Sequence, residues 1–326
     1  MDLENRTDLP ALLFRTALTG DRFAASVIAR VTYDILPVGR LRISPDQVWQ
    51  TSAGPWDSEY GPMDGDEVFY RGGVDLMVFG FARSPDRRPV TAMEVVARAG
   101  SEFERRLRIT GKRLWQGSGE NLRISEPEPF TKMPLSLENA YGGKDEWDKL
   151  EIPFPMNPDG KGYAIDADRA IGKPLPNIED PARPVARWDD QPDPVGVGAT
   201  TMAFGPRVQR GVEIDEETQA ISRITSRLYN SAFPDMVVPC PVESGDKVEV
   251  EGVRHEGPVR FSIPECPISF RLTFGHEVID RSLTVDQIGI EPDEMRAFVT
   301  WRYPFRYRLI PEQLRSAELF PANSDE

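Results

Sequence analysis

Prolines interrupt the middle of this chain so often that they limit what it can fold into. Between residues 147 and 211 they stand at Pro153, Pro155, Pro158, Pro174, Pro176, Pro181, Pro184, Pro192, Pro194 and Pro206. Each proline fixes φ and lacks a backbone donor, so long helices and central strands are excluded here. We nevertheless expect an ordered, functional segment, because apolar anchors are spread through it: Trp147, Phe154, Tyr163, Ile165, Leu175, Ile178 and Trp188.

Strand patterns flank this segment on both sides. Apolar and polar residues alternate in residues 27–35, 103–109, 247–253, 259–263, 268–274 and 297–301. Two more continuous apolar runs, residues 74–82 and 92–97, are separated by a polar turn cluster and predict a hairpin of buried strands. Short helices are expected at 216–228 and 311–319.

These patterns predict a mainly β fold, a β-sandwich or meander-like sheets, with long Pro/Gly-rich loops and one or two short helices. Three regions follow: an N-terminal β region at 1–146, the Pro/Gly-rich ordered loop segment at 147–211, and a C-terminal β region with short helices at 212–326. The sequence leaves open whether they form one compact domain.

The charge balance limits the partners. The chain of 326 residues has 39 Lys and Arg against 53 Asp and Glu, a net charge of −14. Nucleic-acid and anionic-membrane binders need a basic surface, so neither partner is expected. Residues 1–10 lack the pattern of a secretory signal, and no run approaches a membrane span. Two cysteines make no disulfide scaffold, so we expect a cytoplasmic protein.

Metal and cofactor motifs are incomplete. The four residues Cys240, His255, Cys266 and His276 are too widely spaced for a typical structural zinc site. Residues 157–168 resemble a calcium loop, but Lys161 stands where an oxygen ligand is needed and Asp168 replaces the bidentate Glu. Residues 196–201 begin like a dinucleotide-binding loop and lack its third glycine. We therefore predict no catalytic residue, metal or cofactor.

Without a nucleophile motif, a binding module is favoured over an enzyme. One alternative stays open, a carbohydrate-active β-sandwich enzyme that uses a carboxylate pair. The candidate pairs are Glu126 with Glu128, Asp145 with Glu146, and Asp189 with Asp190.

Five motifs then occur in the order expected for one bacterial family. They are Thr-Tyr at 32–33, GKRLW at 111–115, MPLSLENAYGG at 133–143, NPDGKGY at 157–163 and LPNIEDP at 175–181. Together they resemble the domain of unknown function 2169 family, and residues 194–198 and 229–235 extend the likeness.

The resemblance implies a non-enzymatic cytoplasmic adaptor or chaperone of a type VI secretion system. Its implied partners are a PAAR-containing effector and the VgrG spike protein, onto which it would help to load that effector. An edge strand or an aromatic groove would provide the binding. The acidic net charge fits a partner with a basic patch. A structural subunit of the spike is a third possibility.

The motif residues have two interpretations. They either shape loops, with Arg113 pairing with Glu138 or Glu179 to hold a long loop on the sheet, or form the cargo surface. Exposed Trp147, Tyr163 or Trp188 would favour the cargo surface. The candidates are Arg113, Trp115, Glu138, Tyr141, Gly142, Gly143, Trp147, Asn157, Tyr163, Asn177, Glu179 and Trp188.

Overall fold

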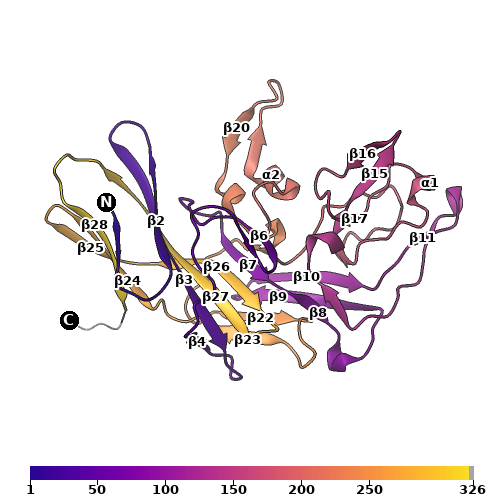
Figure 1. The fold of residues 1–326 in the computed structure, drawn as a ribbon, viewed down its shortest axis with the longest axis horizontal. Coiled ribbons are helices and arrows are strands. Elements are labelled where there is room, and N and C mark those ends of the chain that lie inside the picture. The colour runs from indigo at the N-terminus through magenta and orange to yellow at the C-terminus, as the bar shows by residue number, and fades with distance from the viewer. Residues whose placement is uncertain (323–326) are drawn as a thin grey trace.

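A seven-stranded sheet in the middle of the molecule combines strands from both ends of the chain (Figure 1). Its order is β2-β3-β27-β26-β7-β21, with β4 paired to β3; the β26–β7 pair is parallel and the other pairs are antiparallel. The strands are β2 (Ala11–Ala17), β3 (Arg22–Ile35), β4 (Leu41–Ile43), β7 (Val74–Val78), β21 (Val237–Val238), β26 (Thr284–Glu291) and β27 (Arg296–Arg308). The computed structural model describes residues 1–322.

Two further sheets flank the central one along the long axis of the molecule (Figure 1). The five-stranded antiparallel sheet consists of β18 (Ile178–Glu179), β10 (Phe103–Thr110), β9 (Ala92–Ala99), β22 (Lys247–Glu251) and β23 (Val259–Ser262), in that order. The four-stranded sheet consists of β1 (Leu3–Asn5), β28 (Arg315–Pro321), β24 (Ile268–Phe274) and β25 (Glu277–Ser282). The amino terminus lies in this last sheet.

Short hairpins and turns complete the fold. The two-stranded pairs are β5 (Trp56–Ser58) with β6 (Gly61–Met63), β8 (Phe81–Arg83) with β13 (Lys132–Pro134), β11 (Trp115–Gln116) with β12 (Arg123–Ile124), β14 (Tyr141–Gly142) with β17 (Lys161–Gly162), β15 (Lys144–Trp147) with β16 (Leu150–Pro153), and β19 (Val212–Ile214) with β20 (Ile221–Ile224). The helices are α1 (Ala167–Ala170) and α2 (Gly205–Gly211), and the 3₁₀ turns are η1 (Pro85–Arg87), η2 (Gly119–Asn121), η3 (Leu137–Asn139), η4 (Ser226–Tyr229) and η5 (Pro234–Met236).

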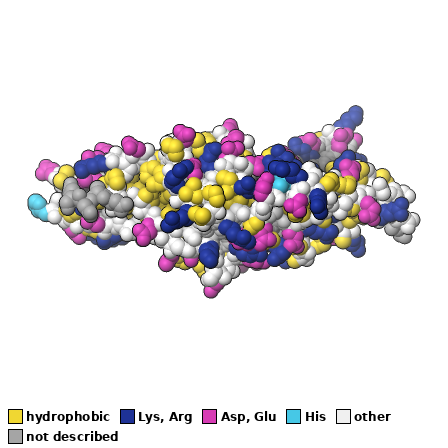
Figure 2. Space-filling model, turned by 90° about the horizontal axis from the view of Figure 1, so that it is seen from below, with side chains coloured by type: hydrophobic (Ala, Val, Ile, Leu, Met, Phe, Trp, Pro, Cys, Tyr) yellow, Lys and Arg dark blue, Asp and Glu magenta, His cyan; other side chains and the backbone are white. Residues whose placement is uncertain are grey.

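One continuous apolar core joins the three large sheets. It contains Val27 and Val31 of β3, Leu107 of β10 and Phe270 of β24, all inaccessible to solvent. A second, smaller core lies under the proline-rich segment and includes Trp115. On the face seen from below, hydrophobic side chains gather around the middle of the long axis, and charges of both signs are interspersed (Figure 2). The mainly β class predicted from the sequence is confirmed.

A row of buried polar residues crosses the central sheet. Arg30 pairs with Thr300, Thr300 with Gln287, and Gln287 with Asp75, so the four side chains share one face. Arg30 donates to Thr300 Oγ1 at 2.9 Å and to Gln287 Oε1 at 3.0 Å, and Gln287 donates to Asp75 Oδ2 at 3.1 Å. Buried polar groups are tolerated when they find such partners. The row therefore favours the observed register of β3, β27, β26 and β7.

Three local expectations are wrong. Residues 216–228 form the outer part of the β19–β20 hairpin and the η4 turn instead of a helix, and residues 311–319 contain the start of β28. The runs at 74–82 and 92–97 do not form a hairpin, because β7 pairs with β26 and β21 whereas β9 pairs with β10 and β22. Residues 216–228 contribute instead to the local β19–β20 hairpin, whereas β28, β7 and β9 each pair with a strand distant in sequence.

Candidate partner-binding site

The structure gathers most of the residues predicted from the motifs in and around the smaller core. Tyr163 and Trp188 are half-buried there, while Glu138 and Trp147 are exposed. The buried residues of the set are Arg113, Trp115, Tyr141, Gly142, Gly143, Asn157, Asn177 and Glu179. Burial of these residues agrees with the loop-shaping interpretation for this part of the set.

Arg113 holds the proline-rich segment on the edge of the five-stranded sheet. Its Nη2 lies 2.6 Å from Glu179 Oε2 and also donates to the carbonyl of Pro176 at 2.6 Å. The other oxygen of Glu179 accepts the backbone N–H of Val185 at 3.0 Å. Of the two carboxylates considered from the sequence, Glu179 is the partner, and Glu138 is exposed.

The glycines of the same region allow two segments to approach closely. A Cβ on Gly142 would lie 2.1 Å from the carbonyl oxygen of Asn157, and one on Gly143 would lie 2.7 Å from that of Gly160. Asn157 in turn donates to the carbonyls of Leu137 and Tyr141 at 3.0 Å. Glycine is therefore required by contact here, which explains the Gly-Gly motif.

Trp147 is more exposed than the other aromatic residues of the predicted set. It pairs across the β15–β16 hairpin with Leu150, and the two side chains are 56% and 68% exposed. The guanidinium of Arg169 lies 5.4 Å from the centre of the Trp147 ring. The turn itself contains Asp148 and Lys149 at φ 47° and 63°, as a two-residue hairpin turn requires. This exposed pair agrees with the cargo-surface interpretation for Trp147 alone.

A second hairpin, which sequence reasoning missed, projects from the body between helix α2 and turn η4 (Figure 1). Cross-strand pairs place Val212 opposite Ile224 and Ile214 opposite Ile221. A bulge in the register brings Ile221 and Ile224, three positions apart, to the same face. Ile214, Ile221 and Ile224 are 58%, 64% and 50% exposed. The hairpin therefore presents an apolar face, which we call the hairpin face.

The hairpin face continues into a pocket at the foot of the hairpin. This pocket, of about 230 Å³, is lined by Ile224 together with Leu18, Phe69 and Tyr70, and by Arg306. The Arg306 guanidinium lies 5.5 Å from the centre of the Phe69 ring. Exposed apolar side chains that adjoin in this way are typical of protein-interaction sites.

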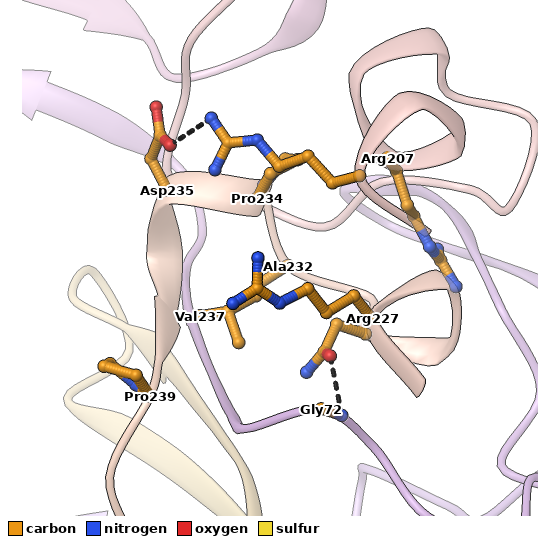
Figure 3. Close-up of a pocket in the computed structure, with 10 residues that line it drawn as sticks. Gly72, Arg207, Arg227, Ala232, Pro234, Asp235, Val237 and Pro239 are labelled. Atoms are coloured by element: carbon orange, nitrogen blue, oxygen red, sulfur yellow. Dashed lines mark hydrogen bonds and ion pairs between the residues drawn. The ribbon is translucent and has the colours of Figure 1, made fainter. Parts of the chain in front are cut away.

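An arginine-lined pocket of about 280 Å³ opens on the other side of η4 (Figure 3). Arg207 and Arg210 come from α2 and Arg227 from η4, so two of the arginines stand at the two feet of the hairpin. Arg210 pairs with Asp235 at 2.6 Å, and Asp235 also lies 3.2 Å from Arg105. Pro234, Val237 and Pro239 form the apolar wall in Figure 3.

Buried hydrogen bonds fix the η4 turn to the central sheet. Asp75, at the end of the polar row, accepts from Asn230 Nδ2 at 2.9 Å and from the backbone N–H of Ser231 at 2.8 Å. Arg71 bonds the carbonyl of Tyr229 and donates to Ser231 Oγ at 2.8 Å. The row thus positions the segment that carries Arg227.

The charge of Arg71 is maintained despite complete burial. Burial alone would lower the pKa of its guanidinium, but the carboxylates of Asp286, Asp75 and Asp66 outweigh that effect and raise it. The Arg71 Nε lies 3.0 Å from Asp286 Oδ2. Arg207 is likewise paired with Asp64 and donates to the carbonyl of Thr200 at 2.9 Å. Arg71 and Arg207 therefore anchor the segments around η4 to the body of the protein.

Three carboxylates of the enzyme alternative's candidate pairs contact neighbouring groups of the fold. Asp145 lies 2.8 Å from Lys173, Asp189 lies 2.9 Å from Arg187, and Asp190 caps a turn through the N–H groups of Ala186 and Arg187. Across residues 1–322, the described side chains include no cluster of three or more His, Cys, Asp or Glu suited to a metal ion. The same residues contain no helix with the length and apolarity needed to cross a membrane.

Fold and site together define a β-rich protein with an exposed apolar hairpin beside an arginine-lined pocket. A family model described as an uncharacterized protein conserved in bacteria (DUF2169) matches residues 21–302. The chain belongs to this family, as its motifs indicated. Searches of the curated proteins and of the solved structures found no match.

Proposed function

We propose that the protein is a non-enzymatic cytoplasmic adaptor that binds a PAAR-containing effector of a type VI secretion system and helps to load it onto the VgrG spike. Membership of a family of bacterial proteins supports the proposal, as does the resemblance carried by the motifs at 111–115, 133–143, 157–163 and 175–181.

The hairpin face is the observation that carries the proposal. Strands β19 and β20 pair with each other, and within residues 1–322 no further strand pairs with either. An isolated two-stranded hairpin is marginal in water, and three isoleucines that are half or more exposed gain free energy when a partner covers them. A partner can cover the apolar face or add a strand to a free edge, and both are known modes of peptide recognition.

The proposal is tested by co-expression with the PAAR-containing protein encoded beside this one. Affinity purification and size-exclusion chromatography of the wild type are expected to give a stable complex. The double variant Ile214→Ser/Ile221→Ser should weaken it by at least about tenfold, because each buried isoleucine contributes roughly 1.5–3 kcal/mol.

Val278→Ser is the matched control, since Val278 is a β-branched residue that is 57% exposed on the distant strand β25. It should bind like the wild type. Lack of binding by the wild type to both the effector and VgrG would contradict the adaptor proposal.

A further inference from the structure

Arg227 stands out because it lines the arginine pocket without an ionic partner. The other two arginines of the pocket are neutralised, Arg207 by the partly buried Asp64 and Arg210 by Asp235. Within the part of the chain that the structure describes, Arg227 has no carboxylate within 4.0 Å and no side-chain hydrogen bond. In Figure 3 its guanidinium lies in the middle of the pocket, between Val237 and Ala232.

The position of Arg227 is fixed by its stem. A Cβ on Gly72 would lie 3.0 Å from both Cγ and the backbone nitrogen of Arg227, so the stem packs on the bare backbone of Gly72. Gly72 is held in turn by a 2.9 Å bond from its N–H to Asn230 Oδ1, drawn in Figure 3. These contacts restrict the stem of Arg227 at the pocket, while its guanidinium stays available for a ligand.

The charge of the pocket selects the ligand. Three arginines face one lining aspartate, Asp235, whose charge is shared between Arg210 and Arg105. A guanidinium fork is suited to a carboxylate, and the Arg227 side chain is exposed, so a ligand can reach it. The volume of about 280 Å³ has room for a side chain with its backbone. The site lies at the feet of the hairpin, so a segment bound there can continue along the hairpin face.

We propose that this pocket binds a carboxylate on an exposed acidic segment of the effector, with Arg227 as its direct ligand. This inference rests on the proposed adaptor function and names the chemistry of its partner. The protein has a net charge of −14 and so repels acidic segments at long range. Binding of such a segment therefore depends on the local positive charge of Arg227.

Charge reversal at Arg227 tests the inference on the complex. Arg227→Glu should lower the affinity for the effector at least about tenfold, as measured by calorimetry, because it places a carboxylate against a carboxylate. Arg40→Glu makes the same change of net charge at another exposed arginine, on the β3–β4 turn, and should leave affinity unchanged. Replacing the contacting acidic residue of the effector by arginine should restore binding to Arg227→Glu.

A second measurement separates this inference from the adaptor proposal. Fluorescence anisotropy with labelled hexaglutamate should show salt-sensitive binding to the wild type, loss of binding to Arg227→Glu, and no binding of labelled hexaglutamine. If the effector binds the wild type and Arg227→Glu equally and hexaglutamate binds no better than hexaglutamine, the pocket inference is overturned while the adaptor stands. If the effector does not bind but hexaglutamate does, the adaptor proposal fails and the carboxylate site remains.

Discussion

Arg113 shows how a single side chain can hold a long irregular segment on a sheet. Its guanidinium is buried against Glu179 and the carbonyl of Pro176, both contributed by the proline-rich segment. Prolines stiffen that segment but remove backbone donors, so side chains must supply the attachment. A charged pair in such a place is costly to break and less costly to replace as a whole.

Removing one partner of this pair should therefore be strongly destabilising. Arg113→Met is expected to lower the free energy of unfolding by about 3–5 kcal/mol, because Glu179 would be left buried without its cation. The double variant Arg113→Met/Glu179→Gln should recover part of the loss. Urea denaturation measures both. A loss below about 1 kcal/mol in the single variant would show that the pair contributes little.

Asp145 should make the stability of the folded protein depend on pH. Burial alone would raise the pKa of its carboxyl, but Lys173 and the backbone N–H groups of Ile165 and Glu146 outweigh burial and hold it below its ordinary value of 3.8. The unfolded chain therefore takes up this proton at a higher pH than the folded protein does. The stabilisation by Asp145 is present above about pH 4 and is lost as pH falls through the lower, folded pKa.

Comparison with Asp145→Asn isolates this effect. The difference in free energy of unfolding between wild type and variant should be largest near neutral pH and shrink as pH falls below about 4. Urea titrations across that range test it. A difference that stays constant with pH would exclude Asp145 as the source.

At the scale of elements, periodicity located strands better than it located their partners. Residues 268–274 alternate strictly, and β24 has the same bounds. The hairpin expected between 74–82 and 92–97 failed because β7 pairs with the distant strands β21 and β26, while β9 pairs with the following strand β10 and the distant strand β22. The polar row could not be predicted for the same reason, since Arg30, Asp75, Gln287 and Thr300 meet only once the sheet has formed.

The residues of the candidate site likewise divide into those that the sequence could predict and those that it could not. The Arg113–Glu179 pair could be anticipated because both residues belong to motifs, whereas the hairpin face lay in a stretch expected to be helical. A signal was nevertheless present: Val212 and Ile214 flank a polar residue, and Asp215 opens a turn by accepting the N–H of Thr218 at 2.8 Å. A regular two-residue period cannot predict the bulge that places Ile221 and Ile224 on the same face.

The hairpin should be dispensable for folding. All four residues of β20 are exposed, so joining Val212 to Ile224 through a short Asn-Gly turn in place of residues 213–223 removes little buried surface. Thermal unfolding should occur at nearly the wild-type Tm, while the effector should no longer co-purify. A variant that unfolds far below the wild type would mean that the hairpin supports the core, and a variant that keeps full binding would place the effector elsewhere.

For the whole molecule, the arrangement places the candidate binding surfaces away from the amino terminus. In Figure 1 the β15–β16 and β19–β20 hairpins both project on the upper side, and the four-stranded sheet with the amino terminus lies at the far end. The polar row of the central sheet ends beneath η4, at the foot of the β19–β20 hairpin. This rigid support allows a short hairpin to present its apolar face in a fixed orientation.

Hydrogen exchange of the wild-type protein with and without the PAAR-containing effector tests whether the hairpin face binds that effector. Binding is expected to slow exchange in residues 205–229, which span α2, the β19–β20 hairpin and η4, with little change in β24 and β25. Unchanged exchange in 205–229, together with new protection confined to the β15–β16 hairpin around Trp147, would contradict it.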